Sequence, residues 1–71
     1  MMPTLKQIER LNQFLLDLYS MKVPPEIVKF SRRGNKPFII IQIEPLHNIK
    51  MTRWYTINWR GELDDDPRQI F

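Results

Sequence analysis

The chain has 71 residues, no cysteine and a formal net charge of +3. A chain this short forms one domain of marginal stability, and without cysteine it has neither disulfides nor a thiolate zinc site to strengthen it. Its polar N-terminus and the lack of an apolar run of about 18 residues argue against a signal peptide and a transmembrane helix. We therefore expect a cytoplasmic domain, not bound to a membrane, that depends on tight packing or on association with another chain.

The charge is unevenly distributed along the sequence. Residues 1–60 contain ten Lys or Arg side chains against four acidic ones, whereas residues 61–71 contain one against four. The net charge therefore conceals a basic body with an acidic end. We divide the chain into a single domain, residues 1–63, and an acidic C-terminal tail, residues 64–71.

An amphipathic helix is predicted over residues 4–22. Thr4 and Gln7 have the spacing of a capping box, and Pro24-Pro25 ends the helical pattern. Apolar residues recur at three- and four-residue spacing and form a stripe that we expect to pack on a sheet: Leu5, Ile8, Leu11, Phe14, Leu15, Leu18 and Tyr19. Leu16 lies outside this stripe and is a candidate contact for a second copy or another protein.

Three strands are predicted next, near residues 26–32, 37–44 and 51–60. A basic hairpin turn at Gly34-Asn35 joins the first two strands, and residues 45–50 make a longer connection to the third. Strand alternation assigns one set of residues to the side of the helix: Ile39, Ile41, Ile43, Met51, Tyr55, Ile57 and Trp59. The predicted fold is α+β, an N-terminal amphipathic helix packed on an antiparallel β-meander of three strands, or of four if Glu62-Leu63 pairs as well.

The far face of this sheet is the first candidate site. Phe38, Ile40 and Trp54 are expected there as an apolar centre, bordered by Gln42, Thr56 and Arg60. Aromatic residues surrounded by polar ones are typical of protein interfaces, although the 45–50 connection or the tail is an alternative cover for this face. The first hypothesis is a small non-catalytic protein-interaction or regulatory module, which binds itself or a protein partner through Phe38, Ile40, Trp54 and Leu16.

Interleaved cations and aromatic residues support a second hypothesis, a small nucleic-acid-binding regulator. Cations can follow phosphates while an exposed ring stacks on a base. The candidate residues lie at the hairpin tip and on the third strand: Arg32, Arg33, Lys36, Arg53, Trp54 and Arg60. The acidic tail could fold onto this tip and compete with nucleic acid. A third hypothesis is an inhibitor or antitoxin-like protein that acts through the tail.

Catalytic residue types are scarce in this sequence. The single histidine, His47, is predicted in a loop, and Ser20 and Ser31 have no recognisable arrangement with a histidine and an acid. The acids at 62 and 64–66 lack the spacing of a calcium-binding loop. We therefore expect no enzymatic activity, no cofactor, no metal site and no small-molecule substrate.

Overall fold

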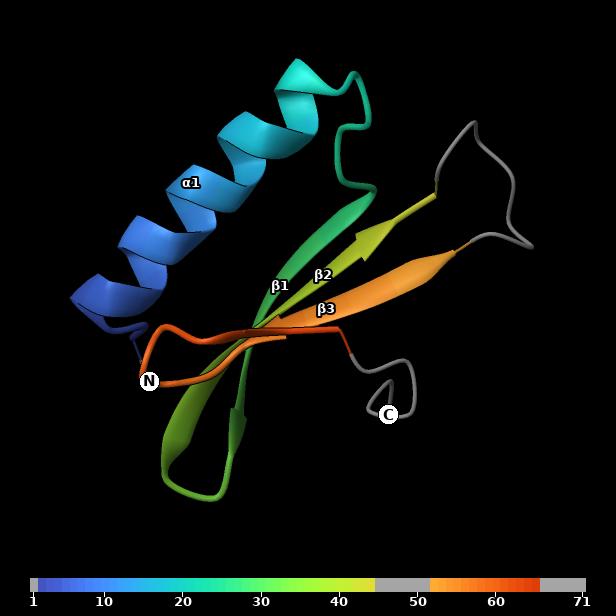
Figure 1. The fold of residues 1–71 in the computed structure, drawn as a ribbon. Coiled ribbons are helices and arrows are strands. Elements are labelled where there is room, and N and C mark those ends of the chain that lie inside the picture. The colour runs from blue at the N-terminus through green and yellow to red at the C-terminus, as the bar shows by residue number, and fades with distance from the viewer. Residues whose placement is uncertain (1, 45–51, 66–71) are drawn as a thin grey trace.

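A computed structural model describes residues 2–44 and 52–65, and these residues form one helix and one four-stranded antiparallel sheet. The elements are α1 (Leu5–Ser20), β1 (Ile27–Arg33), β2 (Lys36–Ile43), β3 (Arg53–Ile57) and β4 (Leu63–Asp64). The strands lie side by side in the order β1-β2-β3-β4, and α1 lies on one side of the sheet (Figure 1). The predicted α+β fold with a β-meander is confirmed, including the short fourth strand.

The start of α1 is fixed by the capping box that the sequence predicts. The Gln7 backbone N–H donates to Thr4 Oγ1 at 3.2 Å, and the Thr4 N–H donates to Gln7 Oε1 at 2.7 Å. The Gln7 side chain is fully buried, and its Nε2 also donates to the backbone oxygens of Pro37 at 2.8 Å and Ile57 at 3.2 Å. One amide therefore caps the helix and ties it to β2 and β3.

The helix ends at Ser20, two residues before the predicted limit. The Val23 N–H donates to the Leu18 oxygen at 2.9 Å, and the Lys22 N–H donates to the Tyr19 oxygen at 3.0 Å. Lys22 adopts φ +60, so these bonds form a Schellman motif in which lysine takes the position that usually holds glycine. Val23 packs against the core at this turn, which precedes Pro24-Pro25.

The core lies between α1 and the two central strands. It contains seven buried apolar residues: Leu11, Phe14, Leu18, Ile39, Ile41, Ile43 and Ile57. Tyr55 packs against them, with its ring centroid 5.0 Å from that of Phe14. The predicted helix side of β2 and β3 is thus confirmed at these positions, while Met51 lies outside the described residues.

The predicted helix stripe is only partly buried. Leu5 and Tyr19 were expected to pack on the sheet, but they are 73% and 61% exposed. The buried residues Gln7, Leu11, Phe14 and Leu18 define the side of α1 that faces the sheet. At about 100° per residue, Leu5 lies on the solvent side of the helix and Tyr19 on one flank. Within the described parts of the chain, no helix is long and apolar enough to cross a bilayer.

Trp59 is the main error in the predicted strand faces. β3 ends at Ile57 instead of continuing to residue 60, and the chain turns over residues 58–61. The Gly61 N–H donates to the backbone carbonyl oxygen of Asn58. The side-chain Oδ1 of Asn58 accepts from the backbone N–H groups of Arg60 and Glu62. Alternation does not continue through a turn, and the Trp59 ring packs against Phe38, whose side chain points away from the helix.

Replacing Gln7 by Met should lower the free energy of unfolding by about 2–3 kcal/mol. Met has a similar volume, but it leaves the Pro37 and Ile57 carbonyls without their donor and breaks the capping box. Urea unfolding followed by circular dichroism measures the change. Gln13→Met is the matched control because Gln13 is exposed on the same helix, and it should change stability by no more than about 0.5 kcal/mol. Equal effects would contradict the role given to Gln7.

Replacing Gly61 by Ala should destabilise the protein more than replacing Gly34 by Ala, by about 1 kcal/mol or more. Both glycines have positive φ, +80 and +59, so an added side chain strains the backbone in each case. At Gly61 the new Cβ would also lie 3.0 Å from the Lys6 carbonyl oxygen, whereas at Gly34 it would meet nothing within 4 Å. Thermal unfolding of both variants gives the comparison, and a larger loss for Gly34→Ala would contradict it.

Candidate functional site

The far face of the sheet brings together three of the four predicted interface residues. Ile40 pairs with Thr56 and Gln42 pairs with Trp54, so Ile40 and Trp54 are diagonal neighbours, and Phe38 lies two residues before Ile40 on the same face. All three apolar side chains are half-buried. Leu16 is 66% exposed on α1, which covers the opposite face. A single contact cannot therefore include Leu16 together with the other three residues.

The predicted nucleic-acid residues are also divided by the fold. Arg33, Lys36 and Arg60 gather at the end of the sheet that carries the β1–β2 hairpin. Arg32 pairs with Pro37 and points to the opposite side of β1 from Arg33. Arg53 pairs with Ile43 at the other end of β2, where its Nη1 lies 3.9 Å from Asp65 Oδ2 and both side chains are more than half exposed.

Two aromatic rings lie among Arg33, Lys36 and Arg60 at the hairpin end of the sheet. Phe38 and Trp59 make an edge-to-face contact, with centroids 5.8 Å apart and planes at 66°. The Arg33 guanidinium carbon lies 4.7 Å from the Phe38 centroid. Lys36 Nζ and the Arg60 guanidinium carbon lie 4.6 and 5.3 Å from the Trp59 centroid. We call these five residues, Arg33, Lys36, Phe38, Trp59 and Arg60, the basic–aromatic cluster.

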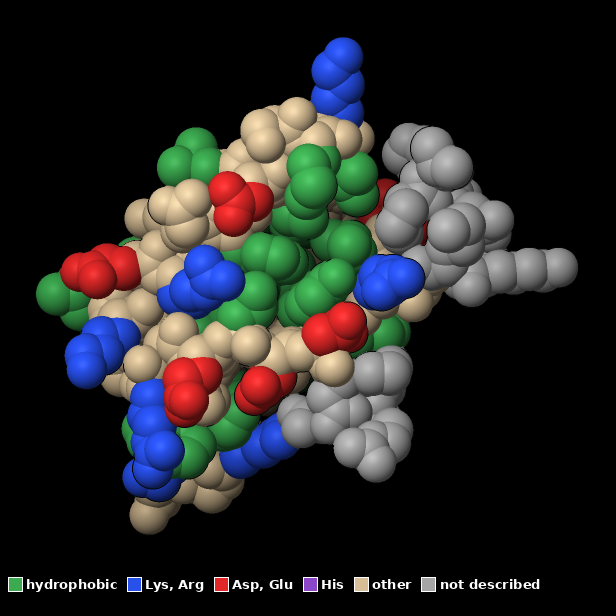
Figure 2. All heavy atoms as spheres, in the orientation of Figure 1, with side chains coloured by type: hydrophobic (Ala, Val, Ile, Leu, Met, Phe, Trp, Pro, Cys, Tyr) green, Lys and Arg blue, Asp and Glu red, His purple; other side chains and the backbone are tan. Residues whose placement is uncertain are grey.

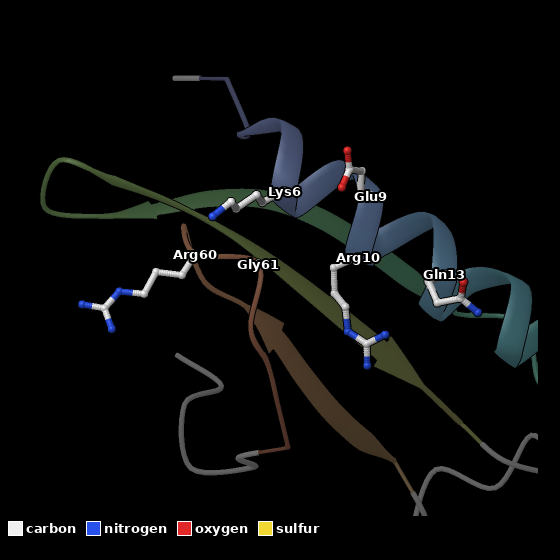
Figure 3. Close-up of a pocket in the computed structure, with 6 residues that line it drawn as sticks. All are labelled: Lys6, Glu9, Arg10, Gln13, Arg60 and Gly61. Carbon is white, nitrogen blue, oxygen red and sulfur yellow. The ribbon is translucent and has the colours of Figure 1, made fainter.

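An open groove of about 460 Å³ lies beside this cluster, between the polar flank of α1 and the turn after β3. Its lining consists of Lys6, Glu9, Arg10 and Gln13 from the helix and Arg60 and Gly61 from the turn. Figure 3 shows Arg10 on one side of Gly61, and Lys6 and Arg60 extending on the other. Arg60 therefore belongs to both the groove and the basic–aromatic cluster, and the lining is mainly basic.

A further group of apolar side chains lies along β1 and the adjacent flank of α1. Val28 and Phe30 pair with Ile41 and Ile39, so they point to the helix side of the sheet, yet they are 38% and 55% exposed. On α1, Ile8, Leu15 and Tyr19 share the flank opposite to Lys6 and Gln13. Since Lys6 packs against Gly61 near β4, this flank faces β1. We call Ile8, Leu15, Tyr19, Val28 and Phe30 the β1 strip.

Sequence reasoning missed both the β1 strip and the role of Trp59. Strand alternation could assign Val28 and Phe30 to the helix side, but the lateral position of α1 decides whether anything covers them. Among residues 2–44 and 52–65, no group of three His, Cys, Asp or Glu side chains could hold a metal ion. His47 and Asp66 lie outside the described residues, as do the 45–50 connection and most of the acidic tail.

Comparison with known proteins gives no relative from which a function could be transferred. No family model matches the chain, and no similar curated protein or solved structure was found. The functional argument therefore rests on the surfaces described above.

Proposed function

We propose that this chain is a small non-catalytic protein-interaction module that associates through the β1 strip and the open edge of β1. The observation that supports this proposal is the exposure of Phe30 and Val28, at 55% and 38%, on a strand of seven residues at the edge of the sheet. Exposed apolar side chains grouped in this way are typical of protein contact sites. The half-buried far face, with Phe38, Ile40 and Trp54, offers less apolar surface to a partner.

Addition of a strand is the mode of association that suits this surface. An edge strand presents unpaired backbone N–H and C=O groups on its outer side, which can pair with a strand of another chain. On the helix side, side chains of the incoming chain would lie beside Val28 and Phe30, with Leu15 and Tyr19 of α1 on the other side of them. The partner would therefore satisfy the backbone edge and cover the β1 strip together.

A second copy of this chain is the partner that fits best. An antiparallel pairing of β1 with itself, centred on Phe30, would use all seven residues of the strand. In this register Lys29 lies opposite Ser31, Arg32 opposite Val28, and Arg33 opposite Ile27, while the two Phe30 side chains face each other. No cation lies directly opposite another cation, and an aromatic pair occupies the centre, which is a favourable set of cross-strand pairs.

The same charges disfavour the neighbouring registers. Centring the pairing on Lys29 would place two lysines opposite each other, and centring it on Ser31 would place Lys29 opposite Arg33. Like charges directly opposite each other destabilise a strand pair. The positions of the three cations thus disfavour both neighbouring registers of self-association.

Light scattering over a range of concentrations tests this proposal, with dimers expected for the unmodified chain. Phe30→Lys should raise the dissociation constant by about 100-fold or more, because two Phe side chains each lose roughly 1.5 kcal/mol of burial and two cations meet at the centre. Leu16→Lys is the matched control, since Leu16 is also exposed, at 66%, and lies on α1 away from β1. A monomer at every concentration, or a dimer that is insensitive to Phe30→Lys, would overturn the proposal.

Hydrogen exchange supplies a second measurement that does not depend on a variant. The outward amides of β1 should exchange more slowly as the protein concentration rises, because they become hydrogen-bonded in the dimer. The amides of α1 provide the internal reference and should not change. Protection that appears on another element instead would place the contact elsewhere.

A further inference from the structure

We infer that the basic–aromatic cluster, extended by Lys6 and Arg10, is a binding site for single-stranded nucleic acid. This inference is independent of the proposed self-association. It rests on three cations of the β1–β2 hairpin and the turn after β3 that lie over two aromatic rings, and on Lys6 and Arg10 of α1, which line the adjoining groove together with Arg60. The ligand class follows from that combination of charge and rings.

Three contacts hold these segments together. Thr4 Oγ1 donates to the Trp59 carbonyl oxygen at 3.2 Å, which joins the start of α1 to the turn after β3. Gly61 lies directly against the Lys6 backbone, and the edge-to-face contact of Trp59 with Phe38 joins the same turn to β2. In Figure 1 the hairpin and this turn lie at the end of the molecule where α1 begins. The cations are therefore carried by a structured surface.

The charge on this surface is predominantly positive. In the described residues, carboxylates lie near the five cations Lys6, Arg10, Arg33, Lys36 and Arg60, including Glu9 in the groove and Glu62 in the turn. The Glu62 carboxylate accepts a hydrogen bond from Asn58 Nδ2 at 2.9 Å. Figure 2 shows Lys and Arg side chains spread over this end of the molecule, with acidic groups beside them. Cations spread in this way suit a chain of phosphates better than one small anion.

The rings distinguish single strands from other polyanions. Phe38 and Trp59 are half-buried, and cations lie over both rings at 4.6 to 5.3 Å. A phosphate would attract these cations away from the rings and free the ring surface for a base, and base–aromatic stacking is a general feature of single-strand recognition. The bases of a duplex are already stacked on one another, and a lipid surface has no bases, so neither ligand can stack on Phe38 or Trp59 in this way. The expected ligand is therefore a single strand with unstacked bases.

Charge variants give the first test. Binding of a fluorescent oligonucleotide of about 12 nucleotides is measured by polarisation at several salt concentrations. The triple variant Arg33→Gln, Lys36→Gln, Arg60→Gln should weaken binding at least tenfold at low salt. It should also reduce the slope of log K against log salt by about 2, since each phosphate contact on a single strand contributes about 0.7.

A matched control removes the same charge elsewhere. Arg32→Gln, Lys22→Gln, Arg53→Gln replaces three exposed cations that lie outside the cluster. This control should bind almost as well as the unmodified chain. Equal losses in both triple variants would show that net charge alone attracts the oligonucleotide, and absence of binding by the unmodified chain at low salt would overturn the inference directly.

The two tryptophans give the second test, because Trp54 and Trp59 are the only ones in the chain. In Trp54→Phe the fluorescence reports Trp59 alone, and oligonucleotide should quench it. In Trp59→Phe the fluorescence reports Trp54, which lies near the other end of β2, and it should change little. Quenching confined to Trp54 would place the bases elsewhere. Equally tight binding of duplex DNA or anionic phospholipid vesicles would overturn the assignment to single strands.

Discussion

The fold depends on the buried amide of Gln7. Its oxygen accepts the Thr4 N–H at 2.7 Å, and its nitrogen donates to the carbonyls of Pro37 and Ile57. Buried amides without partners are costly, so these bonds strongly favour one position of α1 above the sheet. The helix start is thus fixed over β2 and β3, and Thr4 also contacts the turn that carries Trp59. Both candidate surfaces follow from this placement, since it leaves Val28 and Phe30 of β1 exposed and brings Lys6 beside Gly61.

The small size of the chain explains why one surface remains uncovered. A single helix of 16 residues faces four strands and cannot cover the whole of one sheet face. With the helix centred on Ile39, Ile41 and Ile57, the apolar side chains of β1 lie at the margin of the contact. Short chains bury a smaller fraction of their surface than long ones, so an additional partner contributes more to their stability. In the part of the chain that the structure describes, β1 is an edge strand that carries Val28 and Phe30, and we propose that a partner binds there.

Local sequence patterns accounted for much of the fold, because capping and strand alternation act over a few residues. Thr4 with Gln7 predicted the capping box, and the alternation of Ile39, Ile41 and Ile43 predicted the buried side of β2. Trp59 could not be placed in this way. Asn58 forms a turn through its side-chain oxygen, and once β3 ends at Ile57 the alternation no longer relates Trp59 to the sheet.

The candidate sites were harder to predict than the fold, because they depend on contacts between distant segments. The cations at positions 33, 36 and 60 were identified from the sequence, but their common centre, Phe38 with Trp59, arises from the pairing of β2 with the turn after β3. Arg32 and Arg53 were predicted from the same pattern of cations beside aromatic residues, but they lie outside the basic–aromatic cluster. Exposure of Tyr19 and Phe30 likewise depends on the lateral position of α1, which no local pattern specifies.

The two proposed surfaces are connected through β1, whose residues alternate between them. Val28 and Phe30 point to the helix side, whereas Arg33 points to the far side and contacts Phe38. A two-fold pairing of β1 strands with its axis perpendicular to the sheet preserves these sides in both copies. The dimer would therefore carry two basic–aromatic clusters on the same face of one continuous sheet, at opposite ends of the paired strands. A single-stranded nucleic acid long enough to reach both clusters would bind more tightly than a short one, because it would make the same contacts twice.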